Sequence, residues 1–101
     1  MRFIVKITVP NEPFNTYVKD GSVAHRMGNI LAETKPEASY FTELNGVRSA
    51  ILIVNMDETS QIPAIAEPWF LQFNADVEFH PVMLGDDLAK ANLEEIGKKW
   101  K

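Results

Sequence analysis

The sequence predicts a single α+β domain built on a four-stranded antiparallel sheet, and three observations carry this prediction. Apolar and polar residues alternate over residues 2–9 and again over 75–83, as they do in half-buried strands. Two segments between them repeat their apolar residues every 3.6 positions, which is the period of an amphipathic helix. In the middle of the chain, Asn45-Gly46 separates two further alternating runs, and this is typical of a β-hairpin with a two-residue turn.

The N-terminal third should form one strand and one long helix. Residues 2–9 place their odd-numbered apolar side chains on one face, and Pro10 ends the strand. A single helical stripe then covers residues 12–34. Gly21 and Gly28 fall on that stripe, where each glycine costs up to ~1 kcal/mol relative to alanine. We therefore expect these glycines to let the helix pack closely against the sheet.

Residues 37–56 should form the hairpin, with Asn45-Gly46 in a type I′ turn. This register places Glu43 directly opposite Arg48. The register is favoured because opposite charges that face each other across two strands stabilise the pair.

A second helix should follow the hairpin. Its apolar stripe consists of Ile62, Ile65, Ala66, Trp69 and Phe73. Pro68 lies inside this helix, where it removes one backbone hydrogen bond and presses on the preceding turn. We therefore expect a kink or a break beside Glu67. After the last strand, over residues 75–83, Asp86 should cap a terminal helix.

The element order β-α-β-β-α-β, followed by an extra helix, closes most simply as one ferredoxin-like domain over residues 1–101. Both main helices then cover one face of the sheet. The opposite face should carry Arg2, Ile4, Lys6, Glu78 and His80. This mixture is too apolar for an ordinary surface and too charged for the core of a monomer. We therefore expect a homodimer in which a second copy packs on that face.

The chain resembles small uncharacterised bacterial proteins of the ferredoxin-like dimeric α+β barrel superfamily over nearly its whole length. The resemblance lies in the element order and in two stretches, residues 45–54 (NGVRSAILIV) and residues 67–78 (EPWFLQFNADVE). It implies a homodimer whose two sheets pack face to face. The superfamily includes muconolactone-isomerase-like proteins, cofactor-independent oxygenases and haem-degrading enzymes, often with a cleft between helices and sheet. It has no shared catalytic signature, so the resemblance assigns a role to no residue here.

Composition and charge exclude several classes of function. Ten Lys and Arg residues against fourteen Asp and Glu residues give a formal charge of −4, which supplies no basic surface for nucleic acid or an anionic membrane. The absence of cysteine excludes disulfides, thiolate zinc sites and iron–sulfur clusters. Two histidines without metal-ligand spacing predict no metal site, and no cofactor is expected. Since no apolar run is long enough to cross a bilayer, we expect a cytoplasmic protein.

Three residues are candidates for proton transfer. His25 lies at the edge of the first helical stripe, where it could reach a cleft between helix and sheet. The alternative is a boundary histidine that is half in solvent. Glu78 and His80 share a strand face, and a carboxylate that orients an imidazole serves in general-base catalysis. With Lys6 or Arg2 alongside, the same pair can instead form a charge network that fixes the register of the dimer, and we favour this second interpretation.

The aromatic residues near Pro68 predict a ligand pocket between the helices and the sheet. A kinked aromatic helix can leave an apolar cavity beside itself. The residues expected to line the pocket are Tyr17, Tyr40, Trp69 and Phe73, with His25 near its mouth. The bound molecule should be mainly apolar with one or two polar groups. The alternative is that these aromatic side chains simply fill the core.

These patterns predict a protein that binds a small molecule, and three functions follow, of which the sequence does not rank the first two. The first is an isomerase or oxygenase without a cofactor, acting on an aromatic or otherwise apolar substrate. The second is an accessory protein that binds such a ligand without turnover. The third is a structural or interaction module in which the polar residues serve assembly.

Overall fold

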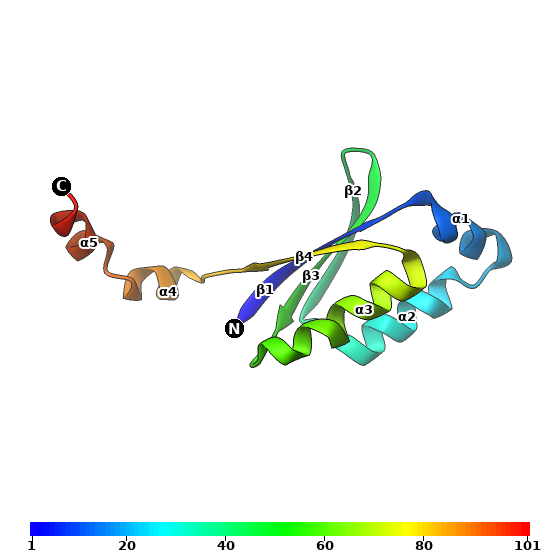
Figure 1. Ribbon diagram of the computed structural model, residues 1–101, viewed down its shortest axis with the longest axis horizontal. Coiled ribbons are helices and arrows are strands. Elements are labelled where there is room, and N and C mark those ends of the chain that lie inside the picture. The colour runs from blue at the N-terminus through cyan, green and yellow to red at the C-terminus, as the bar shows by residue number, and fades with distance from the viewer.

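Four antiparallel strands form one sheet in the order β2-β3-β1-β4. The computed structural model describes residues 1–101, and Figure 1 shows the course of the chain. The elements are β1 (Arg2–Val9), α1 (Asn11–Asp20), α2 (Val23–Thr34), β2 (Ala38–Leu44), β3 (Val47–Asn55), the short 3₁₀ turn η1 (Thr59–Gln61), α3 (Ile62–Phe73), β4 (Asp76–Pro81), α4 (Gly85–Lys90) and α5 (Leu93–Lys99). This order and topology confirm the predicted ferredoxin-like α+β fold.

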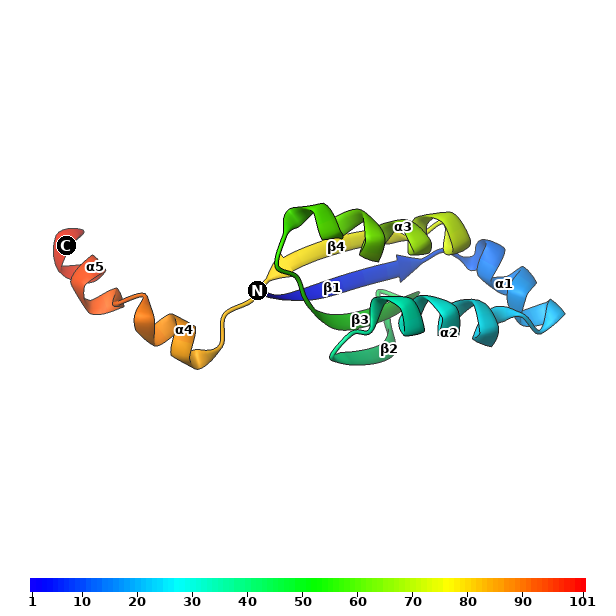
Figure 2. The same cartoon turned by 90° about the horizontal axis from the view of Figure 1, so that it is seen from below.

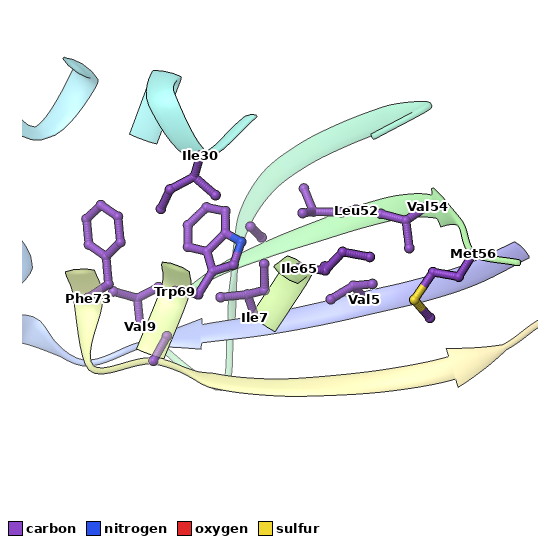
Figure 3. Close-up of a cluster of buried hydrophobic side chains, with 12 residues drawn as sticks. Val5, Ile7, Val9, Ile30, Leu52, Val54, Met56, Ile65, Trp69 and Phe73 are labelled. Carbon is purple, nitrogen blue, oxygen red and sulfur yellow. The ribbon is translucent and has the colours of Figure 1, made fainter. Parts of the chain in front are cut away.

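The core lies between the sheet and the helices α2 and α3, which cover the same face of the sheet (Figure 1). Strand β1 is central, and its Val5 pairs with Leu52 of β3 on one side and Phe79 of β4 on the other. These apolar side chains face the helices, as the two-residue period predicts. Figure 3 shows Val5 and Leu52 in one cluster with side chains of the two helices, namely Ile30 of α2 and Ile65, Trp69 and Phe73 of α3.

No helix covers the other face of the sheet (Figure 1). We call this the open face. It carries the side chains in register with the even-numbered residues of β1, and these include Ile4, Lys6, Tyr40, Ile51, Ile53, Glu78 and His80. Ile4, Ile51 and Ile53 are only half-buried there. The predicted mixture of apolar and charged residues is therefore present on one surface.

The hairpin has the predicted register but not the predicted ion pair. Asn45 and Gly46 have φ values of 55° and 78°, as a type I′ turn requires, and Glu43 lies opposite Arg48. The Glu43 carboxylate accepts the Gly46 N–H at 2.6 Å, while Arg48 Nη1 donates to Asn15 Oδ1 at 2.7 Å. Glu43 and Arg48 thus each bind another group. The Asn45-Gly46 turn is sufficient to set the register of the hairpin.

The single helix expected over 12–34 is wrong, because the chain forms two helices there. Gly21 has a φ of 81°, and its N–H donates to the Val18 carbonyl at 3.3 Å, in the left-handed conformation that ends many helices. The Asp20 carboxylate then accepts the Ser22 N–H at 2.8 Å. The apolar stripe does not reveal this break because it keeps its period on both sides of Gly21.

Gly28 is not held against the sheet, so that expectation is also wrong. Apart from the backbone of its own helix, no atom lies within 4 Å of the position that a Cβ would occupy. The face of α2 that carries Gly28 is therefore open at this residue. The absence of a side chain at Gly28 therefore does not bring α2 closer to the sheet.

Helix α3 continues through Pro68 without a break. It runs from Ile62 to Phe73, and its buried side chains are Ile65, Ala66, Trp69 and Phe73. The proline removes one backbone hydrogen bond, whereas burial of this apolar face stabilises the helix as a unit. Packing therefore decides the course of the chain here.

The last nineteen residues form a C-terminal arm, residues 83–101, that projects away from the sheet (Figure 2). The predicted terminal helix appears as two short helices, α4 and α5, because Asn92 between them has a φ of 56° and interrupts the helical backbone. Every residue of the arm is exposed. None of the ten elements is a helix long and apolar enough to cross a membrane.

Candidate functional site

A cleft of about 210 Å³ opens between the helices and one end of the sheet. Six elements contribute to it. The lining residues are Val9, Phe14, Met27, Phe41, Thr42, Arg48, Ser49, Ala50 and Trp69. Its walls are mainly apolar, and Trp69 is the one residue of the predicted pocket that lines it.

Trp69 contributes a polar atom to this apolar wall. Its side chain is 1% exposed and lies between Ile30 and the side chains of the sheet (Figure 3). The indole N–H, on Nε1, has no hydrogen-bond partner. A buried donor without an acceptor costs about 1–3 kcal/mol, and buried tryptophans ordinarily satisfy this group. One of the residues that line the cleft therefore carries a buried hydrogen-bond donor without an acceptor.

Phe73 packs against the aromatic residues of the cleft on the side away from the cleft. Its ring centroid lies 5.6 Å from that of Trp69 and 5.7 Å from those of Phe14 and Tyr17. The Tyr17 contact is edge-to-face, and such pairs stabilise beyond their buried area. Phe73 itself is fully buried and does not line the cleft. It positions the residues that do.

Arg48 places a positive charge at the cleft. Its guanidinium carbon lies 4.4 Å from the centroid of the Phe14 ring, and its Nη1 donates to Asn15. These two contacts fix the guanidinium over an aromatic residue of the lining. An anionic or strongly polar group on a bound molecule would meet this charge.

The predicted pocket residues separate into different environments. Trp69 lines the cleft and Phe73 lies behind it. Tyr17 packs on Phe73 and under the Arg26 guanidinium, 3.8 Å from its carbon. Tyr40 is on the open face, 61% exposed, and its neighbour Phe41 lines the cleft instead. Tyr40 therefore contributes no hydroxyl to this site.

Sequence reasoning overlooked Phe41 and Arg48 as residues of the cleft, although a signal for Phe41 is present. The hairpin register pairs Phe41 with Ala50, and Ala50 pairs with Ile7 of β1. Since Ile7 faces the helices, its cross-strand partners must do the same. Following the register across three strands would have found Phe41. The interaction of Arg48 with α1 has no such local signal.

His25 lies in a different place, a polar surface groove between α2 and α3. The groove has a volume of about 610 Å³ and includes Ser22, Arg26, Asn29, Glu33 and Gln72. The His25 Nε2 lies 3.3 Å from Asn29 Nδ2, and Arg26 Nη1 donates to Gln72 Oε1 at 2.9 Å. His25 does not line the apolar cleft.

Glu78 and His80 both lie exposed on the open face, at the outer strand β4. The Lys6 ammonium is 3.4 Å from the Glu78 carboxylate, so the expected charge contact between the two strands is formed. His80 is in register with Ile4, whereas Glu78 is in register with Lys6. The described residues include no cluster of three or more histidine and carboxylate groups that could hold a metal ion.

A scan against protein-family models finds no match to this chain, and a search of curated proteins finds none either.

Proposed function

We propose that the protein binds a small, mainly apolar molecule in the cleft between the helices and the sheet. The unpartnered indole N–H of Trp69 carries this proposal. Native cores leave few buried donors without an acceptor, and this donor belongs to a residue of an apolar cleft. A bound molecule that offers an acceptor to Nε1 would remove that energetic cost.

The volume of the cleft limits the ligand. A dry cavity of about 150 Å³ holds benzene, and drug-sized ligands need about 300 Å³ or more. The cleft, at about 210 Å³, suits one aromatic ring with a few further atoms. The positions of Trp69 and Arg48 favour a ring that bears one hydrogen-bond acceptor, as in an aromatic acid or ketone.

Binding is supported ahead of turnover. An isomerase or oxygenase that moves a proton needs an acid or base within reach of its substrate. Neither His25 nor His80 lines the cleft, and neither does Glu78. An accessory protein that holds a ligand is thus the function that the geometry supports best.

We further propose that two copies of the chain join through the open face as a dimeric α+β barrel. The half-buried Ile4, Ile51 and Ile53 support this because they form an apolar area on a surface that no helix covers. The Lys6–Glu78 contact lies beside it and can set the register of the two sheets.

A titration with aromatic acids such as benzoate and phenylacetate, followed by isothermal calorimetry, tests the ligand site. Trp69→Phe keeps an aromatic wall but removes the N–H, and we expect affinity to fall about two- to tenfold, in line with the net value of one hydrogen bond. Ala50→Leu fills the cleft from the buried floor that Ala50 forms, and it should abolish binding.

Gly28→Ala is the matched control, because Gly28 lies in open space away from the cleft. It should leave the affinity unchanged. Equal affinity for the wild type and Ala50→Leu would place the ligand elsewhere. A folded wild-type protein that binds none of these compounds would refute the proposed ligand class.

A further inference from the structure

The C-terminal arm carries an apolar stripe that nothing in its own chain covers. Leu84, just before α4, and Leu88 within it are four residues apart. In α5, Leu93 and Ile96 are three residues apart, and Trp100, directly after the helix, is four residues beyond Ile96, so these three lie on one face. These side chains, with Met83, are between 45% and 77% exposed. They leave on the order of 600 Å² of apolar surface, which reaches or exceeds the largest patch of a typical monomer.

The helices of the arm are encoded locally but cannot be stable alone. The Asp87 carboxylate accepts the Leu84 N–H at 2.9 Å. In α5, acidic Glu94 and Glu95 occupy the first turn and basic Lys98 and Lys99 the last, which suits the helix dipole. Yet α4 has 6 residues and α5 has 7, far fewer than the ~12–15 that an isolated helix needs. Their stability must come from packing of the apolar stripe.

The arm does not pack on the rest of its own chain in this structure. The radius of gyration is 17.2 Å, whereas a compact domain of this length has about 13 Å. Figures 1 and 2 agree that the arm leaves the end of β4 and continues away from both the sheet and the helices. A surface that covers the arm would therefore have to come from another molecule.

We infer that this molecule is a second copy of the chain, so that the two protomers of the homodimer exchange their arms. The inference rests on the homodimer that forms part of the proposed function. Two arms, together with the surfaces that they cover, would bury roughly 2,000 Å², above the ~1,600 Å² of a standard stable interface. A two-fold axis makes such an exchange self-complementary, because each chain supplies one arm and one receiving surface.

The position where the arm starts supports the exchange. Pro81, just before the arm, is in register with Phe3 at the start of β1, and the Val82 N–H donates to the Arg2 carbonyl at 3.1 Å. The arm thus leaves at the end of the sheet where β1 begins. When a second sheet lies on the open face, the arm passes its own sheet and reaches the partner.

Trp100 reports directly on this contact. The chain has two tryptophans, of which Trp69 is buried and Trp100 is 77% exposed in the single chain. The spectrum of Trp100→Phe, subtracted from that of the full-length wild type, isolates the emission of Trp100. We expect this emission to be blue-shifted and shielded from iodide in the dimer, and to become red-shifted and several-fold more quenched as dilution dissociates it.

A pair of variants in α5 tests the same contact by sedimentation. Ile96→Lys places a charge on the apolar stripe and should weaken dimerisation at least tenfold. Lys98→Ala changes an exposed cation of the same helix, which contacts only Glu94 and Glu95, and should leave dimerisation unchanged.

The outcomes separate the two proposals. A dimer whose Trp100 stays fully quenchable, or whose affinity is unchanged by Ile96→Lys, overturns arm exchange and leaves the homodimer standing. A wild type that is monomeric at every concentration overturns both. A monomer with a shielded Trp100 shows an arm folded on its own body, which also overturns the exchange.

Discussion

The guanidinium carbon of Arg48 lies 4.4 Å from the centroid of the Phe14 ring, so an arginine of the hairpin contacts α1 across the mouth of the cleft. Its cross-strand neighbour Glu43 is bound to the turn instead. The strand pair and the helix are thereby joined through a residue that the hairpin register alone would assign to a cross-strand ion pair.

Arg48→Ala should lower the free energy of unfolding by about 0.5–1 kcal/mol, the value of an exposed cation–π contact. Glu43→Gln should have a separate effect, because its carboxylate bonds the Gly46 N–H. A double-mutant cycle measured by urea denaturation should give a coupling near zero between the two. A coupling above about 0.5 kcal/mol would show that the two charges interact.

Gly28→Ala should raise the melting temperature. The added methyl meets no atom outside its own helix, and alanine stabilises a helix interior by up to about 1 kcal/mol over glycine. Gly21→Ala should lower the melting temperature, because Gly21 has a φ of 81° that alanine adopts only with strain. Thermal unfolding followed by circular dichroism compares the two, and a loss of stability in Gly28→Ala would contradict the open environment of that residue.

Phe73→Ala should destabilise the protein by about 3–5 kcal/mol, because it removes a fully buried ring against which Phe14, Tyr17 and Trp69 pack. Leu71→Ala, in the same helix but 78% exposed, should stay within about 0.5 kcal/mol of the wild type. Chemical denaturation measures both. Similar losses in the two variants would contradict the assignment of the buried face of α3.

Asp20 should titrate below its ordinary pKa of 3.8, because hydrogen bonds from the Ser22 side chain and backbone N–H favour the charged form. A lowered pKa stabilises the folded state above the unfolded value, and this contribution is lost as the pH falls through the folded value. The connection between α1 and α2 should therefore loosen only under acid conditions. NMR titration of the carboxyl carbon checks this, and Ser22→Ala should move the midpoint back towards 3.8.

Ile4→Glu should weaken the proposed homodimer by more than tenfold, since it places a charge among the isoleucines of the open face. Lys35→Glu, at the end of α2 and away from that face, is the control. Sedimentation at micromolar concentration distinguishes them. Equal association in both variants would exclude the open face as the interface.

Local chemistry explains which features the sequence predicts well. Asn45-Gly46 can satisfy a type I′ turn with little strain, so the hairpin register follows from two residues. The two-residue period assigns the faces of β1 and β4 for the same reason. Burial then selects one face for the helices.

The remaining features depend on contacts between distant segments. The break at Gly21 leaves the apolar stripe intact, and Pro68 is tolerated because packing stabilises α3. The cleft collects side chains from six elements, so no single motif marks it. Tyr40 and Phe41 illustrate the difficulty, because adjacent strand residues point to opposite faces and only the register across the sheet tells them apart.

The two outer strands, β2 and β4, differ in how well their exposed edges resist pairing with another chain. Both β2 and β4 have one side without a hydrogen-bonded partner, and such edges template association between chains. Strand β4 carries Asp76 and Glu78 and ends at Pro81, which has no N–H to donate. Strand β2 instead exposes Tyr40 and Phe41 next to an unpaired backbone. Aggregation under partly denaturing conditions should therefore begin at β2, and Tyr40→Lys should suppress it by placing a charge on this edge.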